Sequence, residues 1–116
     1  MKIFRSSPQK EDELVSGSVF CAQSFFTRLS GLIFRRPLGS GEALLLKDCK
    51  SIHTLGMRYS IDAVFIDREG RIISLFEGIP PWRFLPHISK ASAVMEFRSG
   101  FIKKKKLRTG DVIVLR

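Results

Sequence analysis

Short apolar runs, bounded by glycine, proline or charged residues, recur along most of the chain. Runs of this length that are rich in branched and aromatic residues are typical of β-strands. The pattern predicts strands over residues 2–5, 14–22, 42–47, 61–67, 71–77, 91–98 and 112–115. We expect the first to be an edge strand, residues 6–13 to form a polar turn or mobile loop, and Gly17 to bend the second strand.

The clearest local pattern is a β-hairpin over residues 61–77. Its three-residue turn ends in Gly70, which tolerates the positive φ that such a turn requires. Because Pro80 and Pro81 lack an N–H group, the returning strand cannot pass through them, and a long loop is expected up to residue 90. Residues 91–98 alternate, with Ala91, Ala93, Met95 and Phe97 on one face and Ser92, Val94, Glu96 and Arg98 on the other.

One segment has helical rather than strand periodicity. Ser24 is a suitable N-cap, and the apolar residues after it recur at spacings of three and four up to about Arg35. Residues 101–107 fit either a short turn of helix or a basic loop. The sequence therefore predicts one α+β domain over residues 1–116, with a mainly antiparallel curled sheet or small open barrel and one principal helix.

Positive charge is concentrated near the end of the chain. The formal net charge is +9, while 44% of the residues are hydrophobic and 27% charged, as in ordinary globular proteins. Most of the excess comes from residues 98–116, which contain Arg98, Lys103, Lys104, Lys105, Lys106, Arg108 and Arg116 against Asp111. This segment is a candidate surface for nucleic acid or another anionic partner, and its alternative is a solvated basic loop.

The two cysteines, Cys21 and Cys49, are too few for a disulfide scaffold. The first residues lack the apolar stretch of a signal peptide, and the chain has no asparagine for N-glycosylation. We expect a reducing cytoplasmic location with both thiols free, and no apolar run is long enough to span a bilayer.

Cys49, His53 and Met57 are spaced four residues apart, and each can ligate a soft metal ion. In a strand, residues four apart are about 13 Å apart, so only a loop that folds back on itself could gather all three. A packed methionine, a buried thiol and a hydrogen-bonded histidine are the simpler interpretation. The sequence predicts neither a metal site nor a cofactor.

His53 and Asp62 would make an acid–base pair if they met. No nucleophile motif such as G-x-S-x-G accompanies them, so we favour a non-enzymatic protein. Asp62 would equally accept hydrogen bonds from backbone N–H groups of the 53–57 loop, or pair with Arg58 or Arg35, because a carboxylate beside an apolar strand needs a partner. Both interpretations stay open from the sequence.

Several segments resemble, in order and spacing, the family named Domain of Unknown Function 192. The resemblance covers residues 20–116 and rests on FTRLSGLIFR (26–35), SIHTLGM (51–57), IDAVFID (61–67), PW (81–82), ME (95–96) with Gly100, and GD (110–111). It implies a compact β-rich domain, with residues 53–57 and Asp62 as its signature loop and strand, and it implies no reaction, substrate or cofactor. Many relatives look exported, unlike this chain, and its lysine run is heavier than the family pattern.

We predict a binding site for a small ligand or anion, framed by the helix over residues 24–35, the loop over 49–57, Asp62 and Trp82. Arginine forks match carboxylates and phosphates, and a tryptophan ring stacks on planar ligands. The predicted ligand-binding residues are Arg35, His53, Met57, Asp62 and Trp82. The alternative function is nucleic-acid or anionic-partner binding through Lys103, Lys104, Lys105, Lys106 and Arg108.

Overall fold

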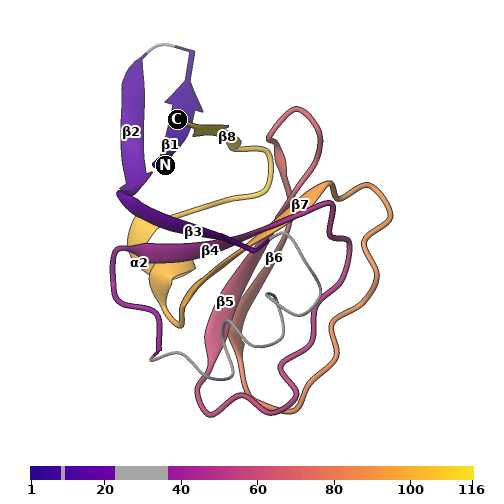
Figure 1. Ribbon diagram of the computed structural model, residues 1–116. Coiled ribbons are helices and arrows are strands. Elements are labelled where there is room, and N and C mark those ends of the chain that lie inside the picture. The colour runs from indigo at the N-terminus through magenta and orange to yellow at the C-terminus, as the bar shows by residue number, and fades with distance from the viewer. Residues whose placement is uncertain (9, 23–36) are drawn as a thin grey trace.

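A computed structural model describes residues 1–8, 10–22 and 37–116. Figure 1 shows the elements in chain order, with the two termini close together. The strands are β1 (Ile3–Ser7), β2 (Lys10–Ser16), β3 (Ser18–Ala22), β4 (Glu42–Lys47), β5 (Ile61–Ile66), β6 (Ile72–Ile79), β7 (Ala93–Arg98) and β8 (Val112–Leu115), and the helix is α2 (Phe101–Lys105). No helix in these described stretches is long and apolar enough to cross a membrane.

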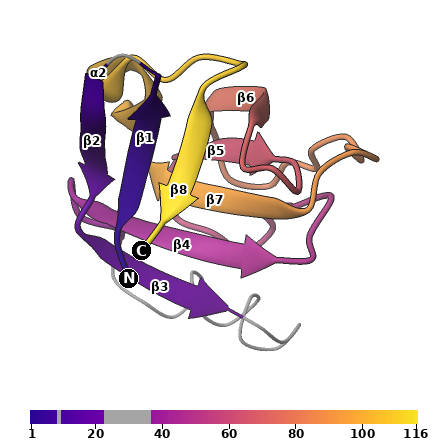
Figure 2. The ribbon, with the colours of Figure 1, turned by 90° about the horizontal axis from the view of Figure 1, so that it is seen from above.

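The strands form two open sheets, and they do not close into a barrel. One sheet has three strands in the order β2-β1-β8, and the other has five in the order β3-β4-β7-β5-β6. Every strand pair is antiparallel except β3 with β4. Seen from above, the three-stranded sheet lies across one face of the five-stranded sheet (Figure 2). The predicted α+β, mainly antiparallel class is confirmed.

The N-terminal segment differs from its prediction. β1 is the middle strand of its sheet rather than an edge, because it pairs with β2 on one side and β8 on the other. β2 covers residues 10–13, half of the stretch predicted as a turn or loop, and β1 covers residues 6 and 7. Because the sequence of β2 is polar, its hydrophobic pattern does not predict a strand. Ion pairs stabilise it instead, between Arg5 and Glu13 at 2.7 Å and between Arg116 and Asp12.

β4 and β8 have the expected bounds, and β5, β6 and β7 match theirs within two residues. The chain changes sheets at Gly17, the predicted bend, between β2 and β3. The β5–β6 turn is also as expected, with Gly70 at φ 82°. A Cβ at Gly70 would lie 2.4 Å from the carbonyl oxygen of Ile113, so only glycine allows the hairpin to approach β8 this closely. The predicted helix over residues 24–35 lies outside the described residues.

Both faces of the five-stranded sheet are covered, which explains why its central strands have apolar residues on both faces. Toward the three-stranded sheet, side chains such as Leu45, Val64 and Met95 pack against Ile3 and against the residues of α2. Phe97 and Phe101 stack there with ring centroids 4.2 Å apart. On the opposite face, alternate side chains of the same strands pack with loop residues; this second cluster includes Leu44, Ala63, Phe65, Val94, Cys49, Ile52 and Met57.

Glu96 interrupts this second, apolar face. It lies on β7 between Leu44 of β4 and Ala63 of β5, and only 3% of the residue is exposed. One carboxylate oxygen, Oε2, has no hydrogen-bond partner. Burial therefore raises the pKa of Glu96 from its usual 4.5 to about 8. The predicted alternation along β7 is confirmed, since Ala93, Met95 and Phe97 share one face. The opposite face, which carries Val94 and Glu96, is buried as well.

We expect Glu96→Gln to change how stability depends on pH. In the parent, the folded state keeps the Glu96 proton up to about pH 8, whereas the unfolded chain releases it above about pH 4.5. The unfolded state therefore binds fewer protons within this range, and the free energy of unfolding falls as pH rises, by a few kcal/mol in order of magnitude. Glutamine cannot ionise, so the variant should lose this slope.

Urea unfolding at pH 5, 7 and 9 measures the effect. Glu77→Gln is the matched control, because Glu77 is exposed on β6 and its removal should leave the slope in place. A parent protein equally stable at pH 5 and pH 9 would contradict the assignment.

Candidate functional site

Two loops, residues 49–60 and residues 80–90, lie side by side and run along one face of the five-stranded sheet, between the end where β4 finishes and the end where β5 begins; we call their combined exterior the loop surface. In Figure 1 they are the magenta and orange segments that run down the right side and meet below the sheet. Backbone hydrogen bonds join them along their length: Ile88 N–H donates to Lys50 O at 2.8 Å, and Leu85 N–H donates to Ile52 O at 3.1 Å. His53 and Phe84 face each other in an isolated antiparallel bridge.

Thr54 fastens the two loops at their centre. It is fully buried, and its hydroxyl donates to Pro80 O at 2.7 Å and accepts from Arg83 N–H at 2.9 Å. Its backbone N–H donates to Arg83 O at 2.8 Å, and its carbonyl accepts from Trp82 N–H at 3.0 Å. One small side chain and its peptide groups thus satisfy the backbone around the two prolines, where a regular ladder is impossible.

The loop surface displays two large aromatic rings. Trp82 is 65% exposed and Phe84 is 74% exposed, and the His53 ring lies 5.9 Å from the Phe84 ring. Trp82 has φ 65°, a left-handed backbone conformation that non-glycine residues adopt at an energetic cost. Exposed aromatic rings that lie together often mark a binding surface.

The same loops carry positive charge without negative charge. Residues 49–60 and 80–90 contain Lys50, Arg58, Arg83, Lys90 and both histidines of the chain, and no aspartate or glutamate. Lys50 Nζ is occupied, since it donates to the carbonyls of Ser89 and Ala91 at 2.7 and 2.8 Å. Arg58 and Arg83 are exposed, and within the described parts of the chain neither guanidinium forms an ion pair. The loop surface is therefore aromatic and cationic.

Asp62 is a backbone clamp. It is fully buried, and its carboxylate accepts hydrogen bonds from Gly78 N–H at 2.8 Å, Gly100 N–H at 3.1 Å and Ile102 N–H at 2.9 Å. The structural role weighed in the sequence analysis is the one observed, but the donors come from the end of β6 and the start of α2. Neither the 53–57 loop nor Arg58 supplies one.

The predicted pocket of His53, Met57 and Asp62 does not assemble. Asp62 lies opposite Phe97 on β7, so it shares the face of the sheet that carries α2. Met57 is buried in the cluster on the other face. A shared pocket was predicted because His53, Met57 and Asp62 are close in the chain. A strand, however, sends successive side chains to opposite faces, and the loop folds under only one of them.

Of the five predicted ligand-binding residues, the structure brings His53 and Trp82 to the loop surface. Met57 supports that surface from below, because the turn over residues 54–57 closes with a hydrogen bond from Met57 N–H to Thr54 O at 3.2 Å. Arg35 lies outside the described residues. Phe84, which was not among the predicted residues, is more exposed than Trp82, and its signal was the spacing of two aromatics around an arginine in PPWRFLP.

Cys49 and His53, two of the three residues with a spacing suited to a soft metal ion, make separate hydrogen bonds instead. The third residue, Met57, is buried. The Cys49 thiol donates to Ser51 O at 3.0 Å, and His53 Nδ1 accepts from Leu55 N–H at 3.2 Å. Both cysteines are free thiols, with Cys21 exposed and Cys49 buried. Among the described residues, no group of three or more histidine, cysteine, aspartate or glutamate side chains is placed to hold a metal ion.

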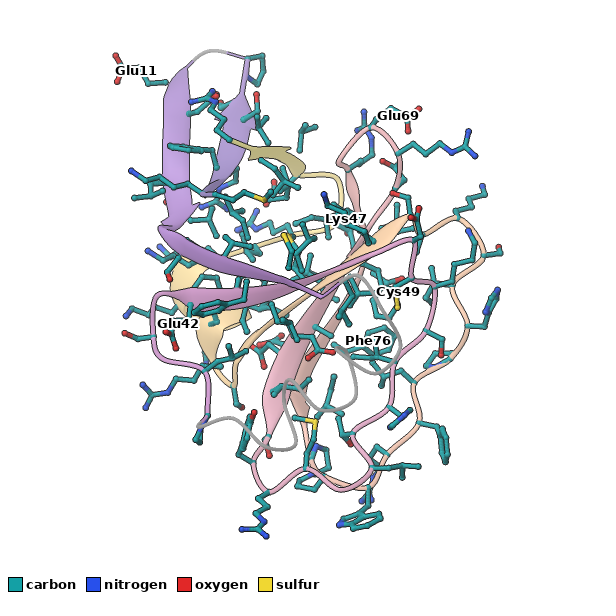
Figure 3. All side chains as sticks on the ribbon, viewed as in Figure 1. Glu11, Glu42, Lys47, Cys49, Glu69 and Phe76 are labelled. Atoms are coloured by element: carbon teal, nitrogen blue, oxygen red, sulfur yellow. The ribbon has the colours of Figure 1, made fainter. Side chains whose placement is uncertain are left out.

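Two hollows of about 470 and 490 Å³ share the β5–β6 turn, at the end of the sheet opposite to Ile79, and the second is also lined by Lys50, Ser89 and Lys90 of the two loops. Figure 3 shows Lys47 and Glu69 at this end. Acidic and basic side chains, including Asp48, Arg68 and Lys90, alternate around both hollows, so no charge type dominates. Their charges do not favour one class of ligand.

The lysine-rich stretch over residues 103–108, here the lysine segment, includes the end of α2. Within the described chain, the side chains of Lys103, Lys104, Lys106 and Arg108 are exposed and form no ion pair. The backbone beneath them is fixed, since Arg5 donates to the carbonyls of Lys105 and Lys106 at 2.8 and 2.9 Å. Of the two alternatives for residues 101–107, the short helix is the observed one.

A family model described as "DUF192: Uncharacterized ACR, COG1430" matches residues 7–115. The chain belongs to the DUF192 family. It is also 31% identical over 100 residues to UPF0127 protein PH1112 of Pyrococcus horikoshii, covering 84% of this chain and 86% of that protein. The resemblance predicted from residues 20–116 is therefore confirmed over nearly the whole chain.

Two solved structures share the fold of this DUF192 domain. A protein of unknown function from Novosphingobium aromaticivorans matches with TM-score 0.82 at 17% identity, covering 99% of this chain and 84% of that one. A second, described as a "putative transcription regulator" from Sinorhizobium meliloti, matches with TM-score 0.80 at 18% identity, covering 97% and 91%. At these identities the likeness establishes the fold.

We expect Asp62→Ala to destabilise the domain by about 3–5 kcal/mol, because three backbone N–H groups lose their acceptor in a buried space. Asp62→Asn should cost less, since an amide oxygen still accepts at one position. Denaturant unfolding at pH 7 measures both. Glu69→Ala is the control, an exposed acid in the hairpin turn, and should stay within about 0.5 kcal/mol of the parent. An Asp62→Ala variant as stable as this control would show that the clamp is dispensable.

Proposed function

We propose that this DUF192 domain is a binding module for an anionic ligand that carries a planar ring, and that the ligand binds at the loop surface. The observation that carries the proposal is the exposure of Trp82 and Phe84 on loops that contain cations and no acids. Aromatic faces stack on planar rings, and unpaired guanidinium groups bind phosphate or carboxylate oxygens.

The rigid backbone of the loop surface supports the proposal. The hydrogen bonds around Thr54 hold the two loops in one arrangement, including the left-handed conformation at Trp82. A surface that is already ordered loses less conformational entropy when a ligand binds. Met57 and Asp62 keep positioning roles here, beneath the surface and behind it. We retain a cytoplasmic location as part of the proposal, on the strength of the two free thiols.

The only tryptophan of the chain reports on this surface directly. We expect adenosine 5′-monophosphate to quench Trp82 fluorescence in a saturable way, and inorganic phosphate or adenosine alone to bind at least about tenfold more weakly. Arg83→Gln should weaken binding of the monophosphate about tenfold by removing a charge-assisted hydrogen bond. Fluorescence titration at low ionic strength, supported by calorimetry, measures each affinity.

Arg68→Gln is the matched control for this titration, because it removes an exposed arginine at the other end of the sheet. If the two arginine variants weaken binding equally, the charge of the whole protein, and not the loop surface, attracts the ligand. If no ring-bearing anion changes the fluorescence of Trp82 at millimolar concentration, the proposed function is wrong.

A second candidate function rests on the lysine segment, whose exposed cations lack partners among the described residues. It is the binding of a polyanion by charge. The affinity for a labelled oligonucleotide should fall with salt, and replacing Lys103, Lys104 and Lys106 by glutamine should reduce the slope of log K against log salt by about 2. A slope that the triple substitution leaves unchanged would remove this segment from the binding surface.

A further inference from the structure

We infer that the loop surface and the lysine segment are two parts of one site, and that its ligand is a single strand of nucleic acid. Bases would stack on Trp82 and Phe84 while phosphates lie along the lysines. The inference rests on the proposed function, since it names the class of ligand that the loop surface takes and extends the site beyond the loops.

Both parts of the site begin at the same end of the five-stranded sheet. Ile61, at the start of β5, pairs with Ile79 on one side and with Arg98 on the other. The loop over 80–90 follows Ile79 directly, and the turn into α2 follows Arg98. Figure 1 shows this arrangement at the lower end of β5, with α2 to the left and the loops below and to the right.

Asp62 connects the two parts through hydrogen bonds to the backbone of each. One carboxylate accepts hydrogen bonds from Gly78, just before the prolines, and from Ile102, in the first turn of α2. Trp82 is four residues beyond Gly78, and therefore within about 14 Å of it along the chain. Lys103 and Lys104 immediately follow Ile102. The loops cover one face of the sheet and α2 the other, so one strand would pass around the end of the sheet at which both parts begin. A strand of a few nucleotides can cover this path, within the roughly 4–16 nucleotides that single-strand-binding domains take.

Both parts of the site also carry positive charge. Exposed cations without a carboxylate partner within the described chain occur on both parts and at their junction, namely Arg58, Arg83, Arg98, Lys103, Lys104, Lys106 and Arg108. Three partly or fully exposed acids lie near the two parts. Glu42 accepts a hydrogen bond from Gly39 N–H at 2.6 Å, Glu77 is exposed on β6, and Asp111 accepts from Arg108 N–H at 2.9 Å and pairs with Arg5. Cations predominate, as a phosphate backbone requires.

The exposed aromatic rings favour a single strand over a duplex. A duplex keeps its bases stacked on one another, so exposed rings on a protein gain little from it, whereas a single strand can place bases on aromatic faces. Base-to-ring stacking tolerates any base, so the site should not select a sequence. Polyanions that lack rings, such as polyglutamate, would engage only the cations.

A length series tests this inference. Thymidine oligonucleotides of one to eight nucleotides are titrated against the full chain at fixed salt, with Trp82 fluorescence as the signal. We expect affinity to rise at least about tenfold between one and six nucleotides and then to level off. A duplex of equal length and polyglutamate of equal charge should bind at least about tenfold more weakly and leave the fluorescence unchanged.

Two variants assign the parts of the site while keeping the fluorophore. Phe84→Ala should weaken both short and long oligonucleotides, and its control is Leu14→Ala, an exposed apolar residue on β2. The triple substitution of Lys103, Lys104 and Lys106 by glutamine should weaken the eight-nucleotide strand about tenfold and leave thymidine monophosphate unaffected. Urea unfolding verifies that each variant remains folded.

The outcomes separate this inference from the proposed function. If the monophosphate binds at Trp82 and affinity does not grow with length, the loop surface is a site for a small ligand and the extended site is wrong. If duplex or polyglutamate binds as tightly as the single strand, charge alone explains the binding and the inference is also wrong. If no nucleotide of any length changes the fluorescence, while another ring-bearing anion does, only the proposed function survives.

Discussion

The carboxylate of Asp62 is the interaction on which the arrangement of this end of the domain depends. A buried carboxylate is tolerated when its oxygens receive enough donors, and here three backbone N–H groups supply them. Gly100, the N-cap of α2, makes no side-chain capping bond, so Asp62 serves as the cap from a distant strand. Arg5 holds the other end of α2, and the short helix is thus fixed by residues far from it in the chain.

The strands that the sequence predicts best are those with covered faces. In β4, β5 and β7 almost every side chain is buried, so their apolar runs stand out without a periodic pattern. β2 is the opposite case, because four of its seven residues are charged and its strand conformation depends on pairing with β1. The middle position of β1 is also hidden, since its second partner, β8, comes from the last residues of the chain.

The candidate site was predicted in part, and the limit has a physical cause. The residue types in the loops indicate a surface that carries His53 and Trp82, because prolines prevent a regular strand there and leave side chains to project. The position of the Asp62 carboxylate depends on backbone N–H donors 16, 38 and 40 residues later in the chain. Local spacing carries no information on such contacts, and it equally hides that the loop with Met57 packs on the other face of the sheet.

The contrast between Asp62 and Glu96 shows how the domain divides its polar groups. Both are buried acids on neighbouring strands, but Asp62 is saturated by backbone donors, while one oxygen of Glu96 has no partner and its pKa rises to about 8. The loop surface follows the first pattern: the backbone of the two loops is occupied internally through Thr54 and the paired carbonyls. The loops are therefore held by their peptide groups, those of Trp82 and Arg83 included, which leaves a rigid frame with exposed side chains available to a ligand.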